Sequence, residues 1–276
     1  MKFLKQLFDF YINSSIHVAL AVFSLTWLTF LEFGIPYDKP LLYFVFFAAI
    51  SGYNFVKYFG LAKFHHRSLA KWLRAIQVFS FCCFILMCYY VLQLQTKVLV
   101  GILVFGVITF FYAMPLLPKS NSENQKSLRS VSGLKVYLIA MVWSGVTVVL
   151  PIVNNDYGII SDALLSFTQR FIYIIVLMIP FEIRDLQYDS PELATIPQKI
   201  GIKWTKILGA ILLLIFFFME FLKTKTYQYQ YLVLFSITVI TALFVMRSKT
   251  NQGKYFCSFF VEGLPILWLL LTLLSC

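Results

Sequence analysis

Nine long apolar segments occupy most of the chain, and they limit the possible folds more than any other feature. A helix needs about 20 largely apolar residues to cross the hydrocarbon core of a bilayer. Hydrophobic residues make up 60% of the sequence, whereas soluble domains usually contain about 45–50%. We therefore predict an all-α polytopic membrane protein, with residues 1–276 forming a single transmembrane domain. The expected spans are 11–31, 41–59, 75–94, 98–117, 136–153, 164–181, 207–221, 229–246 and 256–274.

The basic residues alternate with the gaps between these segments. Seventeen Lys and Arg residues lie in the N-terminal segment and the even-numbered gaps, whereas four lie in the odd-numbered gaps. Because Lys and Arg concentrate on the cytoplasmic side, we expect the N-terminus in the cytoplasm and the C-terminus outside the cytoplasmic (inner) membrane. The net charge of +11 then indicates topology and contact with anionic membrane lipids. No long basic tract indicates nucleic-acid binding, and nothing indicates a protein partner.

Acidic residues gather just after the sixth apolar segment. Glu182, Asp185 and Asp189 are spaced i, i+3, i+7, and on a helix these positions share one face. Mg²⁺ often joins one or two carboxylates to the phosphates of a substrate, so the stripe favours a Mg²⁺–diphosphate site at the membrane surface. Arg184 and Lys199 would complement the phosphate charge. A solvated polar loop leaving a helix is the alternative that the spacing alone leaves open.

The same segment resembles a known motif. Residues 182–189 read E-I-R-D-L-Q-Y-D, followed by Thr195-Ile196-Pro197 and Gly201. This pattern is similar to the second aspartate-rich motif of the UbiA superfamily of intramembrane prenyltransferases, in which acids spaced D-x-x-D-x-x-x-D precede Thr-x-Pro and Gly. The number of expected helices and the position of the motif after the sixth also agree with that superfamily.

The resemblance extends over essentially the whole chain, although the second motif alone is specific. Further similarities are YAMPLLPK, which runs from Tyr112 to Lys119, and Glu262-Gly263 in the last span. The resemblance implies a UbiA-like helical bundle with a lipid-facing central cavity. It also implies that Mg²⁺ bound to aspartate-rich motifs holds a prenyl diphosphate, whose prenyl group passes to a lipophilic acceptor.

The resemblance assigns roles to particular residues of this chain. It predicts Asp185 and Asp189 as catalytic residues, and Glu182, Asp185 and Asp189 as Mg²⁺ ligands. The predicted substrate-binding residues are Asn54, Lys57, Tyr58, Lys63, Tyr112, Lys119, Arg184 and Lys199.

The first aspartate-rich motif of the superfamily is missing. Asn54 is present after the second span, but Tyr58 and Ala62 occupy the positions four and eight residues later, where acids are expected. One interpretation is that Lys57 and Lys63 contact the diphosphate directly, with a single metal ion on the Asp185 and Asp189 side. The other is that catalysis has been lost and a lipid cavity remains.

Three further polar residues, His17, Arg170 and Glu262, lie within apolar spans. Ionisable groups inside a membrane are usually functional or paired, and an Arg170–Glu262 ion pair is one structural explanation. Three functions stay open: a prenyltransferase, a non-catalytic relative that binds a lipid or a partner, and a transporter. Internal inverted repeats would favour the transporter, and none is evident.

Overall fold

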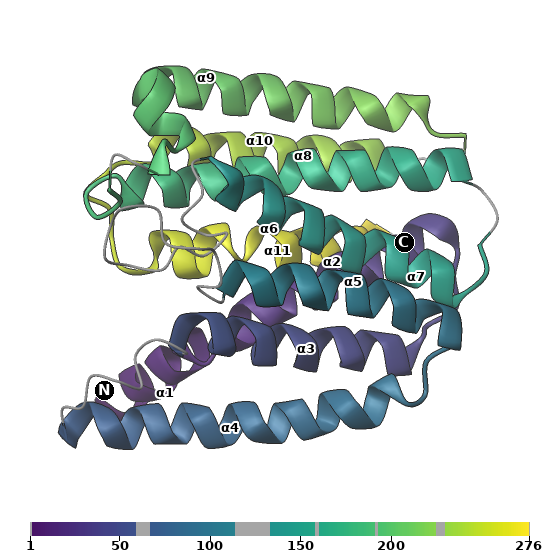
Figure 1. Cartoon of the computed structure of the whole chain (residues 1–276). Coiled ribbons are helices and arrows are strands. Elements are labelled where there is room, and N and C mark those ends of the chain that lie inside the picture. The colour runs from purple at the N-terminus through teal and green to yellow at the C-terminus, as the bar shows by residue number, and fades with distance from the viewer. Residues whose placement is uncertain are drawn as a thin grey trace, which may run out of the picture.

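The computed structural model describes residues 2–58, 67–113, 133–157, 160–190, 193–224 and 230–275. Helices form nearly all of this part of the chain, and it contains no strand. The elements, labelled in Figure 1, are α1 (Lys2–Asn13), α2 (Ile16–Phe33), α3 (Lys39–Tyr58), α4 (Arg67–Val91), α5 (Thr96–Ala113), α6 (Leu134–Ser144), η3 (Gly145–Val149), α7 (Leu150–Asn154), α8 (Ile160–Asp185), α9 (Ile196–Phe218), η5 (Met219–Leu222), α10 (Gln230–Arg247), η6 (Phe256–Val261) and α11 (Leu264–Ser275).

Nine helical stretches among the described residues are long and apolar enough to cross a membrane. This confirms the predicted all-α polytopic fold with nine spans, and the chain is an integral membrane protein. Most boundaries lie close to those expected, but the first span was placed too early. It begins at Ile16 because Ser15 adopts a left-handed conformation with φ of 63°, which separates α1 from α2.

The sixth and seventh spans are longer than the apolar segments that predicted them. The sixth continues to Asp185 and the seventh starts at Ile196, so polar residues extend both helices beyond their apolar parts. The backbone N–H of Thr195 donates to Gln198 Oε1 at 2.9 Å, a bond typical of helix N-termini. Both helices therefore carry polar side chains at the end of the bundle where they meet.

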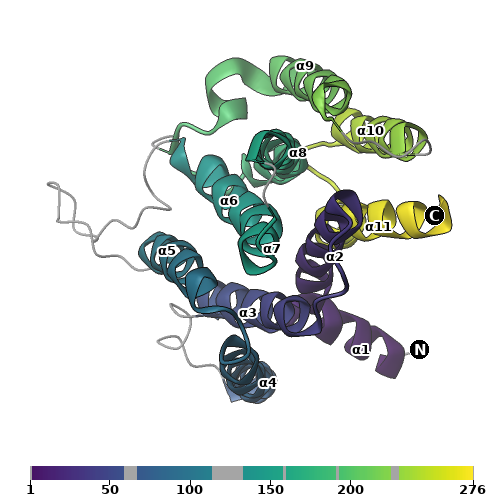
Figure 2. The ribbon, with the colours of Figure 1, turned by 90° about the vertical axis from the view of Figure 1, so that its right-hand side faces the viewer.

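Helix α8 lies at the centre of the larger apolar core. Viewed end-on in Figure 2, it lies among α6, α9 and α10, and it contacts all three. Tyr173 of α8 is fully buried, and its ring centroid lies 5.0 Å from that of Phe216 and 5.2 Å from that of Trp268. Aromatic pairs at such distances stabilise a core beyond the area that they bury. The core thereby fixes the position of α8, whose C-terminal end carries the acidic motif.

Helices α4 and α5 show the opposite pattern, because most of their apolar side chains are exposed. Phe81 of α4 and Leu103 of α5 are more than half exposed, and Val98 is buried on α5. Exposed apolar side chains are expected where a spanning helix faces lipid, since lipid tails are as apolar as the side chains. These two helices, at one edge of the bundle in Figure 2, therefore present a lipid-compatible surface.

The two ends of the bundle differ in what they hold. Figure 1 shows the N-terminus and the C-terminal end of α8 at one end of the bundle, and the C-terminus toward the other. Asp9 of α1 accepts hydrogen bonds from Lys254 Nζ at 2.5 Å and Tyr255 Oη at 2.8 Å, both just before η6. We refer to the end that carries Asp9 and the acidic motif as the acidic end.

Candidate functional site

The three motif carboxylates do not share one uninterrupted helix. Glu182 and Asp185 lie in the last turn of α8, whereas Asp189 follows the helix end in a turn. The Asp189 N–H donates to the Asp185 carbonyl oxygen at 2.8 Å, which curls the chain back over the end of α8. Glu182 is buried, and its Oε2 accepts a hydrogen bond from the Ile196 N–H at 3.3 Å. Glu182 therefore ties α8 to the start of α9.

Asp185 is surrounded by positive charge. Arg184 Nε donates to its Oδ1 at 2.8 Å, and Lys135 Nζ from the start of α6 lies 3.8 Å from its Oδ2. Arg184, predicted to bind substrate, thus lies at this corner together with Lys135, which the sequence did not single out. Lys199 lies near the residue that precedes α6, since a Cβ built on Gly133 would be 3.7 Å from the Lys199 Nζ, and its contact with substrate stays a prediction.

Asp189 has an unpaired oxygen. Its Oδ2 is buried and has no hydrogen-bond partner among the described residues. Gln198 holds the turn in place, with its Nε2 donating to the Ser190 carbonyl oxygen at 3.1 Å. An unsatisfied buried carboxylate oxygen costs free energy unless a ligand completes it. We call the group formed by Glu182, Asp185, Asp189, Lys135 and Arg184 the acidic corner.

The acidic corner does not form a protein-only metal cage. In the ranges that the structure describes, no three His, Cys, Asp or Glu side chains are grouped as metal ligands. Mg²⁺, however, is commonly held by one or two carboxylates together with substrate phosphates and water. The unpaired Oδ2 of Asp189 fits that mode, in which the substrate supplies the remaining oxygens.

Asn54 is committed to bonds within the protein. Its Oδ1 accepts from Ser15 Oγ at 2.8 Å, and its Nδ2 donates to the Ser14 carbonyl oxygen at 2.9 Å and to Ser80 Oγ at 2.7 Å. Lys57 Nζ also donates to Ser15 Oγ, at 2.9 Å. This bracket holds the break between α1 and α2. That Asn54 and Lys57 bind substrate stays a prediction.

The other predicted substrate-binding residues lie in different places. Tyr58 Oη donates to the Asn13 carbonyl oxygen at 2.8 Å, so it too supports the end of α1. Tyr112 is half-buried near the end of α5, where its hydroxyl interacts electrostatically with that of Tyr53. Lys63 and Lys119 lie outside the described residues.

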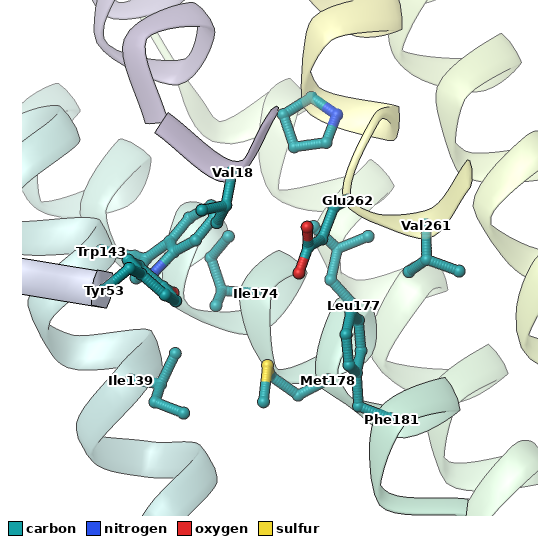
Figure 3. Close-up of a pocket in the computed structure, with 11 residues that line it drawn as sticks. Val18, Tyr53, Ile139, Trp143, Ile174, Leu177, Met178, Phe181, Val261 and Glu262 are labelled. Carbon is teal, nitrogen blue, oxygen red and sulfur yellow. The ribbon is translucent and has the colours of Figure 1, made fainter. Parts of the chain in front are cut away.

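An apolar cavity of about 140 Å³ lies between α2, α3, α6, α8 and the last span (Figure 3). Trp143, Met178 and Phe181 contribute to its wall, and Glu262 is its charged member. The cavity adjoins the acidic corner, because the Arg184 guanidinium lies 5.3 Å from the centroid of the Phe181 ring. The Arg184 side chain therefore connects the acidic corner with the wall of the cavity.

Two wide helical turns shape the walls of this cavity. Trp143 lies just before the π-helical turn η3, and Glu262 lies just after the π-helical turn η6. The Glu262 N–H donates to the carbonyl oxygen of Cys257, five residues earlier, at 3.1 Å. Such turns rotate the following side chain relative to a regular helix and are frequent at functional sites. In η3, Gly145 is required, because a Cβ there would lie 1.9 Å from Phe105 Cζ.

The intramembrane polar residues have partners other than those expected. Arg170 does not pair with Glu262; its Nη1 donates to the Leu25 carbonyl oxygen at 3.0 Å, and its guanidinium lies 5.0 Å from the Trp268 ring centroid. The His17 ring lies between Tyr11 Oη at 2.7 Å and the Phe259 carbonyl oxygen at 2.8 Å. Both residues therefore join helices.

A second polar cluster, which the sequence analysis missed, lies toward the opposite end of α8. Lys223 Nζ donates to Glu32 Oε1 at 2.5 Å, to Gln169 Oε1 at 2.7 Å and to Glu220 Oε2 at 2.8 Å. Burial lowers the pKa of Lys223, but attraction by Glu32 and Glu220 outweighs it, and the net effect is a raised pKa. We call Glu32, Gln169, Glu220 and Lys223 the buried clamp. The one feature of the sequence that indicates the buried clamp is that its charged residues lie at the ends of apolar segments.

The fold and the site define a polytopic helical membrane protein with charged residues beside an intramembrane cavity. No protein-family model and no curated protein sequence matches the chain. Among solved structures, it resembles digeranylgeranylglyceryl phosphate synthase, a UbiA-type membrane prenyltransferase, with a TM-score of 0.57 and 13% identity. The match covers 98% of this chain and 97% of that protein. The chain therefore has a membrane-prenyltransferase fold from end to end.

Proposed function

We propose that the protein is a UbiA-like prenyltransferase that transfers a prenyl group from a prenyl diphosphate to a lipophilic acceptor in the membrane. The observation that carries the proposal is that Asp189 Oδ2 has no hydrogen-bond partner among the described residues, in a corner that also holds Lys135 and Arg184. The corner thus offers an open carboxylate oxygen and two cations, which is the complement of a metal-bound diphosphate.

Mg²⁺ is the proposed cofactor, with Asp189 and Asp185 as its protein ligands. When bound, it would neutralise the diphosphate as a leaving group. Glu182 Oε2 accepts from the Ile196 N–H, which fixes the loop that carries Asp189. That Glu182 is also a Mg²⁺ ligand stays a prediction. Arg184 and Lys135 hold Asp185 in place and contribute positive charge toward the leaving diphosphate.

The apolar cavity beside this corner would take the prenyl chain or the acceptor. Phe181 and Trp143 line it, and aromatic faces attract a developing allylic cation through their quadrupoles. Low water content in the cavity would also protect such a cation from hydrolysis. The proposed orientation follows the basic residues, with the acidic end in the cytoplasm, where soluble prenyl diphosphates and Mg²⁺ are available.

Labelled prenyl diphosphates of several chain lengths test the proposal. Purified protein, Mg²⁺ and a membrane lipid extract are incubated together, and release of diphosphate and formation of a prenylated lipid are measured. We expect both products with the native chain and neither after D185A/D189A double substitution. Product formation that is unchanged in the double variant would refute the assigned site.

A non-catalytic lipid-binding protein is the second candidate. The observation that favours it is the engagement of Asn54 by Ser14, Ser15 and Ser80, at the place where the superfamily has its first acidic motif. This candidate predicts that lipid co-purifies with the chain and that no diphosphate is released for any chain length. The assay above therefore separates the two functions.

A further inference from the structure

We propose that Glu262 and Tyr53 form the binding site for the hydroxyl group of a neutral acceptor, a phenol or a lipid alcohol, inside the apolar cavity. This inference rests on the proposed function and assigns the two residues that bind the acceptor hydroxyl. Glu262 accepts the hydroxyl proton in a hydrogen bond, and the Tyr53 hydroxyl donates to the acceptor oxygen.

The Glu262 carboxylate is an open acceptor. Figure 3 shows it directed into the space between Trp143 and Met178. In the part of the chain that the structure describes, its carboxylate makes no ion pair or side-chain hydrogen bond. A carboxylate on an otherwise apolar wall is costly unless a donor satisfies it. The cavity therefore contains one charged acceptor that a hydrogen-bond donor of a ligand would satisfy.

Tyr53 supplies the complementary donor. Its hydroxyl oxygen accepts a hydrogen bond from Trp143 Nε1 at 2.8 Å, and within the described ranges no residue accepts a hydrogen bond from the Tyr53 hydroxyl. Tyr53 and Glu262 both line the cavity and interact electrostatically. A hydroxyl group is both donor and acceptor, so one ligand hydroxyl satisfies both residues at once.

The surrounding charges select a neutral ligand. Lys57 and Arg184 attract the Glu262 carboxylate electrostatically. A ligand with a cationic head group that bound Glu262 would therefore be repelled by these two cations. An anionic head group would be repelled by Glu262 itself. A hydroxyl carries no net charge and avoids both penalties.

The volume agrees with a ring or a short stretch of lipid chain. The cavity measures about 140 Å³, and an engineered apolar cavity of about 150 Å³ is known to hold benzene. In the reaction, a lone pair of the hydroxyl oxygen forms the new C–O bond with the allylic carbon. The allylic C–O bond breaks with its electron pair passing to the diphosphate, and the hydroxyl proton passes to Glu262.

Quenching of tryptophan fluorescence by 4-bromophenol and by 4-bromoanisole tests the site without catalysis. The two probes differ by a hydroxyl and its methyl ether, and bromine quenches nearby tryptophans such as Trp143. After correction for partition into lipid, we expect the native full-length protein to bind the phenol about tenfold more tightly. E262L should abolish this preference, whereas E262Q, which keeps an amide acceptor, should retain part of it.

Two controls make the result specific. D156N removes an exposed carboxylate elsewhere in the chain and should leave the preference unchanged, whereas W143F should remove most of the quenching signal. An equal preference in E262L and native protein would overturn the inference, as would no preference in native protein or unchanged quenching in W143F. Affinity for prenyl diphosphate should be retained in E262L and fall about tenfold or more in D189N, so failure of this inference and failure of the proposed function give different results.

Discussion

The acidic corner and the buried clamp both place carboxylates and cations between helices, yet they differ in how far their bonds are completed. In the clamp, Glu220 Oε2 accepts from Gln169 and Lys223, and its Oε1 accepts from Gln230. In the corner, Asp189 Oδ2 is buried without a partner among the described residues. A polar network with every group satisfied stabilises the fold by itself, whereas a buried group without a protein partner can be completed by water, an ion or a ligand.

Removing the cation of the clamp should produce the largest loss of stability. K223M leaves Glu32 and Glu220 buried without their shared partner, which typically costs about 3–5 kcal/mol. Unfolding of the purified protein in mild detergent measures the loss, with K223R as the matched control that keeps the charge. Equal stability of K223M and native protein would contradict a structural clamp.

The pH dependence of this loss follows from the raised pKa of Lys223. The pKa of Lys223 in the folded protein lies above its unfolded value of 10.5. Its charge therefore contributes its full stabilisation of the folded state below pH 10.5, and this stabilisation is lost as the pH rises through the folded-state pKa. The stability difference between native protein and K223M should therefore stay constant from neutral pH to about pH 10. It should shrink only at higher pH, and a decline near neutrality would argue against the pairing.

The Asn54 bracket resembles the clamp more than the corner, because its amide groups are already bonded. N54A should destabilise the protein by about 1–3 kcal/mol, since Ser15 and Ser80 lose a buried partner. If Asn54 is structural, as the clamp is, the affinity for prenyl diphosphate should change little in N54A. The affinity is measured in the same detergent, with N54D as a near-isosteric control. A large loss of affinity at unchanged stability would instead place Asn54 in the substrate site, as the sequence predicts.

The reverse pattern is expected for Asp189. D189N removes a charge that has no partner at Oδ2 among the described residues, so the ligand-free variant should be at least as stable as the native protein. Affinity for prenyl diphosphate in Mg²⁺ should fall about tenfold or more, which corresponds to about 1.4 kcal/mol. Thermal unfolding and ligand titration of one preparation give both values, and a strongly destabilised D189N protein would assign Asp189 to structure.

The Asp9–Lys254 pair should have the smallest effect. The Lys254 side chain is 61% exposed, and exposed ion pairs contribute less than about 1 kcal/mol after screening. Hydrogen bonds from Lys254 and Tyr255 lower the pKa of Asp9 below its usual 3.8. The stabilisation that the Asp9 charge provides is therefore present above pH 3.8 and is lost as the pH falls through the folded-state pKa of Asp9. The stability difference between native protein and D9N should disappear in acid; a difference that persists would mean that the pair does not act through the Asp9 charge.

The spans and the position of the acidic motif could be predicted from the sequence because both depend on local pattern. The length of an apolar segment alone identifies a spanning helix. Glu182 and Asp185 come directly after such a segment in the sequence, so their position at a helix end could be predicted. The clamp could not be predicted in this way. Lys223 and Glu32 are 191 residues apart, and no local pattern brings them together.

The cavity also depends on information that the sequence does not display. The π-helical turn η6 directly precedes Glu262, and the turn η3 follows Trp143; no simple residue pattern predicts such turns. Asn54 illustrates the limit of a motif, because its residue type matches the superfamily while its bonds to Ser14 and Ser15 depend on the break between α1 and α2. Residue identity suggested its role, but only packing revealed its partners.

Binding of Mn²⁺, a paramagnetic substitute for Mg²⁺, tests the central claim that a cation and a diphosphate complete the acidic corner. Electron paramagnetic resonance distinguishes protein-bound from free Mn²⁺ in detergent-solubilised protein. We predict bound Mn²⁺ in the native chain when geranylgeranyl diphosphate is present, and little in D189N under the same conditions. Equal Mn²⁺ binding by D189N and native protein, or none by either, would contradict the account.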